Sequence, residues 1–96
     1  MTSKQRAYLN GLASNMDTIF HIGKASLTPE IIEALDAALE KRELIKVGIL
    51  KNCLDDPREI AEMIAERTHS EVIRVVGKKI IFYRQPKKNP KIKLPE

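Results

Sequence analysis

The sequence predicts a two-layer α/β domain built on a four-stranded mixed sheet. Segments with apolar residues at helical spacing alternate along the chain with short, β-branched runs. Clear capping signals open two of the helical segments, and a glycine-first pair that fits a tight hairpin joins the last two β-rich runs. The expected order is α-β-α-β-α-β-β, in which helical crossovers give parallel neighbours and the hairpin gives an antiparallel pair.

The first predicted helix covers residues 3–14, with Thr2 or Ser3 as its N-cap. Its apolar positions, continuing just past the helix end, are Leu9, Leu12, Ala13 and Met16. The run DTIFHI at 17–22 is short, β-branched and aromatic, and it ends at Gly23. Such a run is typical of a strand that leads into a turn.

The second predicted helix has the clearest start in the chain. Thr28 is the expected N-cap and Pro29 occupies the first helical position. We expect this helix to run to about Arg42, with an apolar face of Ile31, Ile32, Leu35, Ala38 and Leu39. The segment 44–50 then alternates apolar residues with Lys46 and a glycine, which predicts a strand with one face inward.

A third helix and a hairpin complete the predicted domain. Either Asp55 or Asp56 caps a helix that ends near His69. Residues 71–76 and 79–84 are β-rich runs joined by Gly77-Lys78, which fits a type II′ hairpin. The predicted core includes Leu12, Ile32, Leu35, Leu39, Ile45, Val47, Ile60 and Ile64.

Composition narrows the classes of protein that need to be considered. Ninety-six residues with 43% apolar content suffice for one modest domain. No stretch approaches the roughly 20 apolar residues of a membrane span, and the opening MTSKQRAY lacks the apolar core of a signal peptide. The single cysteine, Cys53, permits no internal disulfide and no zinc cluster. We therefore expect a cytoplasmic protein without a cofactor or metal.

The charge is distributed unevenly along the chain. Eight basic residues and one acidic residue between Arg74 and Glu96 give that segment a charge of +7, so residues 1–73 carry −3 of the total of +4. Clustered lysine and arginine gain free energy by releasing counterions from a phosphate backbone, which favours a polyanion partner. A solubilising tail explains the same pattern equally well. Residues 85–96 are rich in proline and lysine and predict an extended or disordered tail that contributes to binding a polyanion more than to folding.

The segment between the first strand and the second helix is the most informative one. Gly23, Lys24, Ala25 and Ser26 place a glycine, a cation and two small residues before a helix N-terminus, where free backbone N–H groups and the helix dipole favour an anion. The GxxG loop of KH-type domains clamps a nucleic-acid backbone in this manner. The alternative is an ordinary turn in which Gly23 supplies a positive φ and Lys24 is solvated.

The final hairpin offers a second candidate contact. Lys78 and Lys79 follow Gly77, although a hairpin tip explains this glycine fully. On the last strand, Phe82 and Tyr83 point to opposite faces, so one of them could stay exposed as a stacking platform for bases. Core packing is the expected place of at least one of the two rings.

Little in the sequence indicates catalysis. The only histidines, His21 and His69, have no serine or cysteine nucleophile in a recognisable setting. The acidic residues fall on the polar faces of the second and third helices, which a solvated surface explains. There is no Walker loop, no dinucleotide fingerprint and no metal-ligand spacing. We expect a protein that is not an enzyme.

Five stretches of the chain resemble the YhbY-like family of bacterial RNA-binding proteins. The stretches are LNGLAS (9–14), HIGKASLTPEII (21–32), ALEKRELIKVGIL (38–50), VVGKKIIFYR (75–84) and IKLP (92–95). Members are free-standing copies of the domain named for chloroplast RNA splicing and ribosome maturation, abbreviated CRM. The resemblance implies a fold similar to the C-terminal domain of translation initiation factor three, with a KH-like loop. It also implies an association with precursors of the large ribosomal subunit.

The family loop G-K-x-G falls here on Gly23, Lys24, Ala25 and Ser26, so a serine replaces the second glycine. Serine is small and has a hydroxyl to donate to phosphate, but it disfavours the positive φ that glycine permits. We divide the chain into one RNA-binding domain at 1–84 and a basic tail at 85–96. The expected RNA-binding residues are Gly23, Lys24, Ala25, Ser26, Lys78, Lys79, Arg84, Lys87 and Lys88.

Three hypotheses about function follow. The first is a monomeric, non-catalytic protein that binds ribosomal RNA during large-subunit assembly. The second is an adaptor whose acidic helix faces dock on ribosomal proteins or assembly factors. The third, an RNA-modifying or RNA-cleaving enzyme, lacks a convergent set of acid, base and nucleophile.

Overall fold

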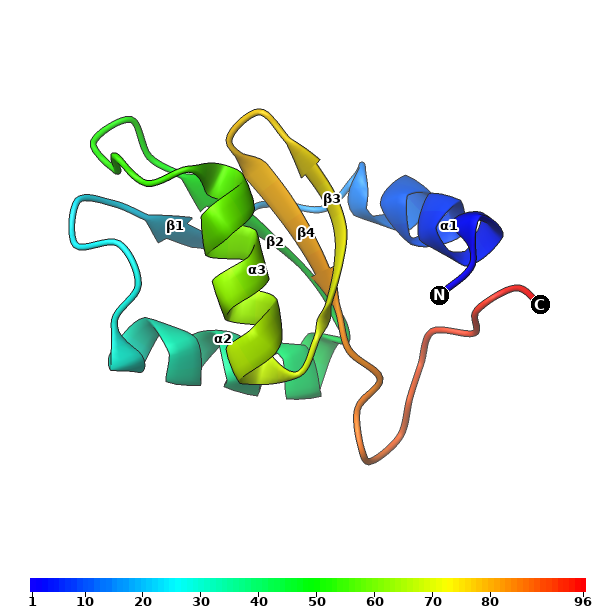
Figure 1. Cartoon of the computed structure of the whole chain (residues 1–96). Helices are drawn as coiled ribbons and strands as arrows, with labels where there is room; N and C mark the ends of the chain where they lie inside the picture. Colours follow the sequence, from blue (N-terminus) through cyan, green and yellow to red (C-terminus); the bar gives the residue numbers. More distant parts are fainter.

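The computed structural model describes residues 1–96 as three helices and four strands (Figure 1). The helices are α1 (Ser3–Ala13), α2 (Pro29–Arg42) and α3 (Pro57–Thr68). The strands are β1 (Phe20–Ile22), β2 (Leu44–Ile49), β3 (Glu71–Val76) and β4 (Lys79–Tyr83). They form one sheet in the order β1-β2-β4-β3, in which β1 runs parallel to β2 and the other neighbours are antiparallel. The predicted element order and mixed α/β class are confirmed.

Each helix begins at a side chain that satisfies a free backbone N–H. In α1, the Thr2 hydroxyl accepts from the Gln5 N–H and the Gln5 side chain accepts from the Thr2 N–H, which forms a capping box. Thr28 caps α2 as predicted. Of the two candidates for α3, Asp56 is the cap, since its carboxylate accepts from the Arg58 N–H at 3.0 Å.

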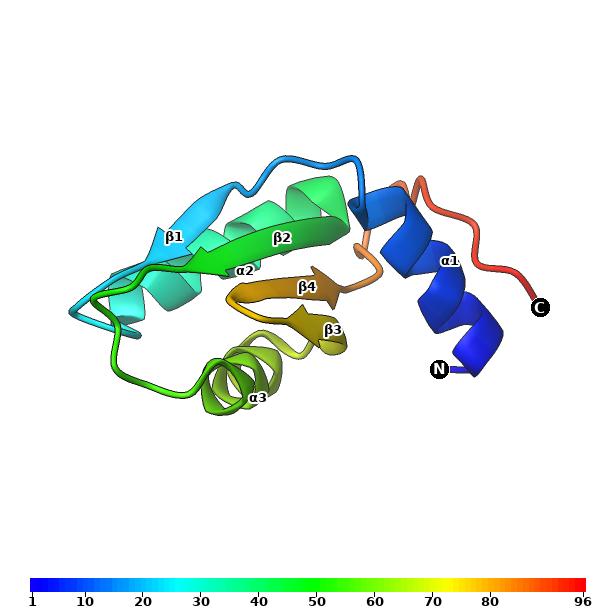
Figure 2. The same cartoon turned by 90° about the horizontal axis from the view of Figure 1, so that it is seen from above.

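Helices α2 and α3 cover one face of the sheet (Figure 2). Alternate residues of the two central strands point toward them, because successive side chains on a strand face opposite sides. The main core under these helices contains Ile22, Leu35, Leu39, Ile45, Val47, Ile49, Cys53, Ile60, Ala61, Ile64, Ile80 and Phe82. Six of the eight predicted core residues are fully buried here.

The second face of the sheet is covered by α1 and by the C-terminal tail. A smaller core contains Leu9, Ala13, Leu44, Ile73, Ile81 and Tyr83, and Met16, Ile92 and Leu94 pack against it. The tail has no helix or strand but packs against the domain, so of the two predicted alternatives, extended or disordered, the structure shows the extended one. Its two apolar residues, Ile92 and Leu94, anchor it to the domain.

Glu43, in the turn between α2 and β2, fastens the tail. Its side chain is buried, and its carboxylate accepts from the N–H groups of Lys91 and Ile92. Its backbone carbonyl accepts from the Arg84 N–H at 2.9 Å. Burial and, second, the Glu43 carboxylate raise the pKa of Tyr83 above its ordinary value. Glu43 appears in the sequence as an ordinary glutamate at a helix end, but in the structure its hydrogen bonds hold the C-terminal tail against the domain.

Three expectations about burial need correction. Leu12 is 39% exposed, because Leu9 and Ala13 define the inner face of α1 and Leu12 lies on its flank. Ile32 is only half-buried at the edge of the main core. Phe82 and Tyr83 are both buried, so neither ring is a stacking platform, since both faces of the sheet are covered at this strand.

None of the three helices combines the length and the apolar character that spanning a bilayer requires.

Candidate nucleic-acid interface

Three connections meet at one edge of the sheet, which we call the loop end and define as residues 23–27, 50–56 and 77–79 (Figure 1). The topology brings them together, because the parallel strands β1 and β2 end at the same edge and antiparallel β4 begins there. The Leu50 N–H donates to the Ile22 carbonyl at 2.8 Å, and the Ile49 N–H donates to the Lys78 carbonyl at 2.7 Å. The predicted loop residues and hairpin residues therefore share one surface.

The segment from Gly23 to Ser26 is a tight turn, closed by a 2.9 Å hydrogen bond from the Ser26 N–H to the Gly23 carbonyl. Lys24 and Ala25 occupy the exposed tip. The positive φ of this turn, 56°, falls on Ser26 and not on Gly23. The expectation that Gly23 supplies the positive φ is therefore wrong, whereas the tight turn and the exposed Lys24 agree with the alternative of an ordinary turn. Serine adopts the left-handed conformation at the position where the resemblance places a second glycine.

A carboxylate from the next connection holds the end of this turn. The Ser26 hydroxyl donates to Asp55, which follows β2 in the sequence. This bond ties residues 23–27 to residues 50–56 and offsets part of the cost of the positive φ at Ser26. The Ser26 hydroxyl, which the sequence offered as a donor to phosphate, is thus engaged within the protein.

Gly23 has no structural reason to be a glycine. Its φ is not in the positive range. A Cβ added at this position would lie 3.4 Å from the Asn52 and Leu50 side chains, which is ordinary van der Waals contact. A glycine that neither turn geometry nor crowding requires leaves close approach of a ligand to the backbone as a reason for its presence.

The β3–β4 hairpin adds two lysines to the loop end. Gly77 has a φ of 56°, as a glycine-first hairpin turn requires. Lys78 and Lys79 are exposed. Lys79 donates to the Thr18 hydroxyl at 3.3 Å, and Lys78 makes no side-chain hydrogen bond or ion pair.

Sequence reasoning missed Lys51, which is exposed in the connection after β2. That connection was treated only as a link between a strand and a helix. The parallel pairing of β1 and β2 was already implied by the helical crossover between them, and it places Lys51 at the same edge as Lys24. The loop end therefore carries four lysines, Lys24, Lys51, Lys78 and Lys79, against the two carboxylates of Asp55 and Asp56.

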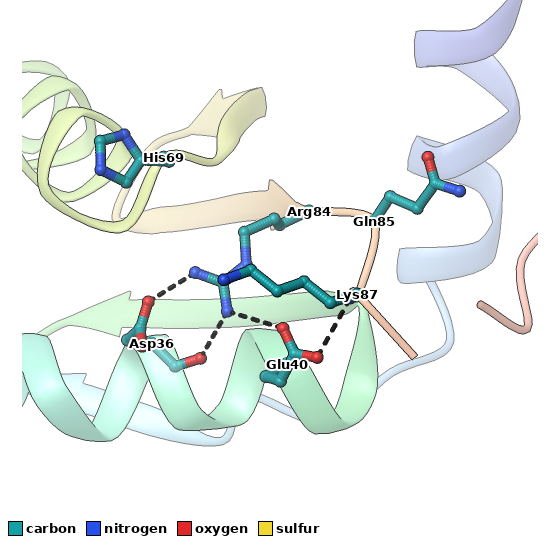
Figure 3. A pocket seen from close by; sticks show the side chains of 6 residues that line it. All are labelled: Asp36, Glu40, His69, Arg84, Gln85 and Lys87. Atoms are coloured by element: carbon teal, nitrogen blue, oxygen red, sulfur yellow. Dashed lines mark hydrogen bonds and ion pairs between the residues drawn. The ribbon is translucent and has the colours of Figure 1, made fainter. Parts of the chain in front are cut away.

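The predicted basic residues beyond β4 lie elsewhere. Arg84 follows the end of β4 opposite the loop end, where its guanidinium contacts Asp36 at 2.5 Å and Glu40 at 3.5 Å (Figure 3). It also donates to the Thr68 carbonyl at 2.7 Å. Its side chain is 17% exposed. These contacts occupy the guanidinium, so Arg84 packs the tail against α2 and α3. The structure does not bring it together with the loop-end lysines.

Lys87 and Lys88 are exposed on the tail, and Lys87 lies beside the same acidic residues. The Lys87 backbone N–H donates to Glu40 at 3.1 Å (Figure 3). Their ammonium groups make no hydrogen bond or ion pair within the chain. Both lysines stay candidate contacts separate from the loop end, and Lys87 lies close to the carboxylates of α2.

The two histidines lie on different elements, and each has a place in the secondary structure. His21 is exposed on β1, and His69 takes a left-handed conformation that ends α3. The structure contains no group of three or more histidine, cysteine, aspartate or glutamate side chains that could hold a metal ion.

Comparisons with known proteins agree with this architecture. The model of the CRS1/YhbY (CRM) domain matches residues 1–84. The chain is 36% identical to a Bacillus subtilis protein named "Probable RNA-binding protein YqeI", over 99% of both chains. It is 28% identical to a Haemophilus influenzae protein named "RNA-binding protein", over 99% of this chain and 95% of the relative.

A solved structure extends the agreement to three dimensions. The solution structure of a hypothetical protein from Staphylococcus aureus matches with a TM-score of 0.83 and 47% identity, over 99% of both chains. The relatives carry names of RNA-binding proteins and not of enzymes. Sequence, fold and topology together show that the chain belongs to the CRS1/YhbY (CRM) domain family.

Proposed function

We propose that this protein binds RNA without catalysis, and that its target is ribosomal RNA in precursors of the large ribosomal subunit. Its place of action is the cytoplasm, and it acts as a monomer. RNA binding is supported by the names of the relatives, and the ribosomal target by the resemblance to YhbY-like proteins.

The observation that carries the proposal is that the turn from Gly23 to Ser26 and the β3–β4 hairpin lie together at the loop end. Lys24 stands exposed at the tip of the turn from Gly23 to Ser26, just before the N-terminus of α2. Free N–H groups and the helix dipole favour an anion at that place. Lys51 and Lys78 widen the site, so several phosphates of one RNA can be contacted together.

RNA shape is the source of selectivity in this proposal. Neither aromatic ring of β4 is available to stack on bases, since Phe82 and Tyr83 are buried. Lysine contacts to phosphate fix position without reading sequence. A protein built in this way distinguishes structured RNA by the arrangement of its backbone.

The test measures the affinity of labelled large-subunit ribosomal RNA fragments for the wild type and for two variants of the turn. Lys24→Ala should weaken binding across many sequences and reduce the salt slope by about one phosphate contact. Lys41→Ala, an exposed lysine at the opposite end of α2, is the matched control and should bind like the wild type.

Ala25→Asp distinguishes a phosphate site from a helix start. A carboxylate at the tip should weaken RNA binding more than Lys24→Ala does, whereas at a simple helix start it would be harmless or slightly stabilising. Ala37→Asp adds the same charge on an exposed position of α2 and serves as its control. Unchanged affinity of Ala25→Asp, with unchanged sedimentation alongside large-subunit precursors, would remove the turn from the RNA surface. Binding to ribosomal proteins but not to RNA would favour the adaptor hypothesis.

A further inference from the structure

A groove runs between α1 and the face of the sheet that α1 partly covers. Two hollows form it and meet at Asn10, which lines both. We call this feature the α1 groove. The residues that matter for its chemistry are Arg6, Asn10, Ser14, Lys46, Arg74 and Lys79.

One wall of the α1 groove is a regular row of polar side chains on the helix. Arg6, Asn10 and Ser14 are spaced four residues apart and lie on one side of α1 and its C-cap. A rise of about 1.5 Å per residue separates successive members by about 6 Å. Arg6 is fixed in place, because its guanidinium donates to the carbonyls of Val72 and Ile73.

The other wall depends on an irregularity in β3. Val72 pairs with Phe82 but Arg74 pairs with Ile81, so Ile73 is an extra residue on the β3 side. The bulge lets Ile73 enter the smaller core while Arg74 stands next to it on the same face. Without the bulge, the alternation of the strand would send one of these two side chains to the α2–α3 side.

The charge of the groove is one-sided. Four basic residues line it, and no acidic residue does. Arg74 makes no hydrogen bond or ion pair within the chain, and Lys79 contacts only the Thr18 hydroxyl. The one nearby carboxylate is that of Glu71, 3.8 Å from Arg6 and 55% exposed. Lys46 donates to the carbonyls of Ala13 and Met16, so Arg74 is the one cation of the groove without a contact in the chain. Lys46, Arg74 and Lys79 are without a carboxylate partner, and such cations along a groove are complementary to a polyanion strand.

The floor of the groove is apolar. Ile81 is nearly buried, and Val76 is 49% exposed beside it. An apolar floor between basic walls suits a nucleic-acid strand, whose bases and sugars pack inward while its phosphates reach the cations. The acidic exposed faces of α2 and α3 lie across the sheet and repel the same strand.

We propose that the α1 groove is a second RNA-binding surface, which takes the sugar-phosphate backbone of a single strand. The strand continues from the loop end, because Lys79 belongs to the hairpin and also lines the groove. This inference rests on the proposed RNA-binding function and extends its surface along α1 toward Arg74.

The test compares two arginine variants that lose the same charge. Arg74→Gln removes the unpaired cation of the groove, and Arg67→Gln removes an exposed arginine of α3 on the other side of the sheet. The probes are fluorescein-labelled single-stranded RNAs of about 6 and about 16 nucleotides, a length range typical of single-strand sites. Arg74→Gln should weaken binding of the longer RNA about fivefold and reduce its salt slope by about 0.7. Arg67→Gln should match the wild type.

A charge-preserving variant and a competing probe complete the design. Arg74→Lys should restore most of the lost affinity, because a phosphate contact needs the charge more than the guanidinium plane. Equal binding by Arg74→Gln and the wild type, while Lys24→Ala binds less well, would overturn the groove and leave the loop end in place. Absence of wild-type binding to these single strands, while large-subunit ribosomal RNA fragments still bind, would overturn the groove alone. Absence of wild-type binding to both kinds of RNA would refute the proposed function itself. The competing probe is polyglutamate, an acidic polypeptide. If Arg74→Gln loses polyglutamate binding but keeps RNA binding, the groove takes an acidic polypeptide and the inference is overturned.

Discussion

The loop end and the tail both carry lysines, but the two regions differ in the carboxylates that surround them. At the loop end, Lys24, Lys51 and Lys78 make no contact with a carboxylate. At the tail, Arg84 is held between Asp36 and Glu40, and the backbone near Lys87 and Lys91 is bound by glutamates. Arg84 is the one side chain of this region that forms an ion pair, while the tail lysines keep free ammonium groups. A run of basic residues in a sequence therefore does not show which of its charges are paired.

The same contrast separates binding from stability. Within the loop end, Cys53 belongs to the main core and Leu27 packs against it, but the lysines are exposed and lie outside both cores. These exposed side chains can therefore change with little effect on folding. The tail adds Ile92 and Leu94 to the smaller core and supplies two N–H donors to buried Glu43. Mutations in the two regions should therefore affect different measurements.

Deletion of residues 85–96 should produce the largest effect on stability. It removes the packing of Ile92 and Leu94 and the hydrogen bonds to Glu43, which together contribute about 3 kcal/mol to the free energy of unfolding. Denaturant unfolding measures this loss. The triple variant Lys87→Ala, Lys88→Ala and Lys93→Ala removes charge but keeps the docking, and should stay within about 0.5 kcal/mol of the wild type. If the deletion variant is as stable as the wild type, the tail contributes nothing to folding, as its composition predicted.

Substitution of single lysines should show which of the two regions contacts RNA. Lys78→Ala at the hairpin should weaken binding of ribosomal RNA fragments about fivefold, as expected for one lost phosphate contact. Lys87→Ala on the tail should change affinity less than about twofold, since Asp36 and Glu40 lie beside Lys87 and lower the positive potential there. Fluorescence anisotropy at several salt concentrations compares them. The reverse order of effects would place RNA on the tail and not at the loop end.

Asp55 should act against RNA at the loop end. Its carboxylate contacts Ser26, so Asp55→Asn removes a negative charge beside the turn while keeping an oxygen that can accept from the Ser26 hydroxyl. Affinity should rise about threefold at low salt and less at high salt. Asp56→Asn keeps an effective N-cap of α3 and should raise affinity less, because the α3 N-terminus already engages its carboxylate. Equal affinity of Asp55→Asn and the wild type would show that phosphate stays away from this turn.

Local signals in the sequence were sufficient for most of the fold. The caps at Thr2 and Thr28 are satisfied by residues three positions away, and the strand alternation of Ile45 and Val47 follows from geometry within one segment. Such patterns are complete within a few residues, so they can be read without knowledge of the tertiary structure.

The errors concern contacts between distant residues. Arg84 binds Asp36, 48 positions away, and the Ile92 N–H binds Glu43 at a separation of 49. The Ser26–Asp55 bond spans 29 positions. Single polar contacts of this kind leave no periodic pattern, so the sequence showed the charges of the candidate site but not which of them are paired. The bulge at Ile73 is equally invisible in the sequence, and with it the position of Arg74.

The pH dependence of stability should show the smallest effect and report on the tail region alone. The pKa of Tyr83 is raised by burial and by Glu43, so the folded state holds this proton more tightly than the unfolded chain does. Its contribution to stability is complete below about pH 10, the pKa of free tyrosine, and is lost as the pH rises through the higher folded pKa. In Tyr83→Phe, stability should therefore fall less steeply above pH 10 than in Tyr8→Phe, which removes an exposed tyrosine of α1. Denaturant unfolding between pH 8 and about pH 11 measures both slopes. Identical slopes would mean that the Tyr83 hydroxyl is as well solvated as that of Tyr8, and that the tail covers the smaller core less closely than Glu43 and Ile92 indicate.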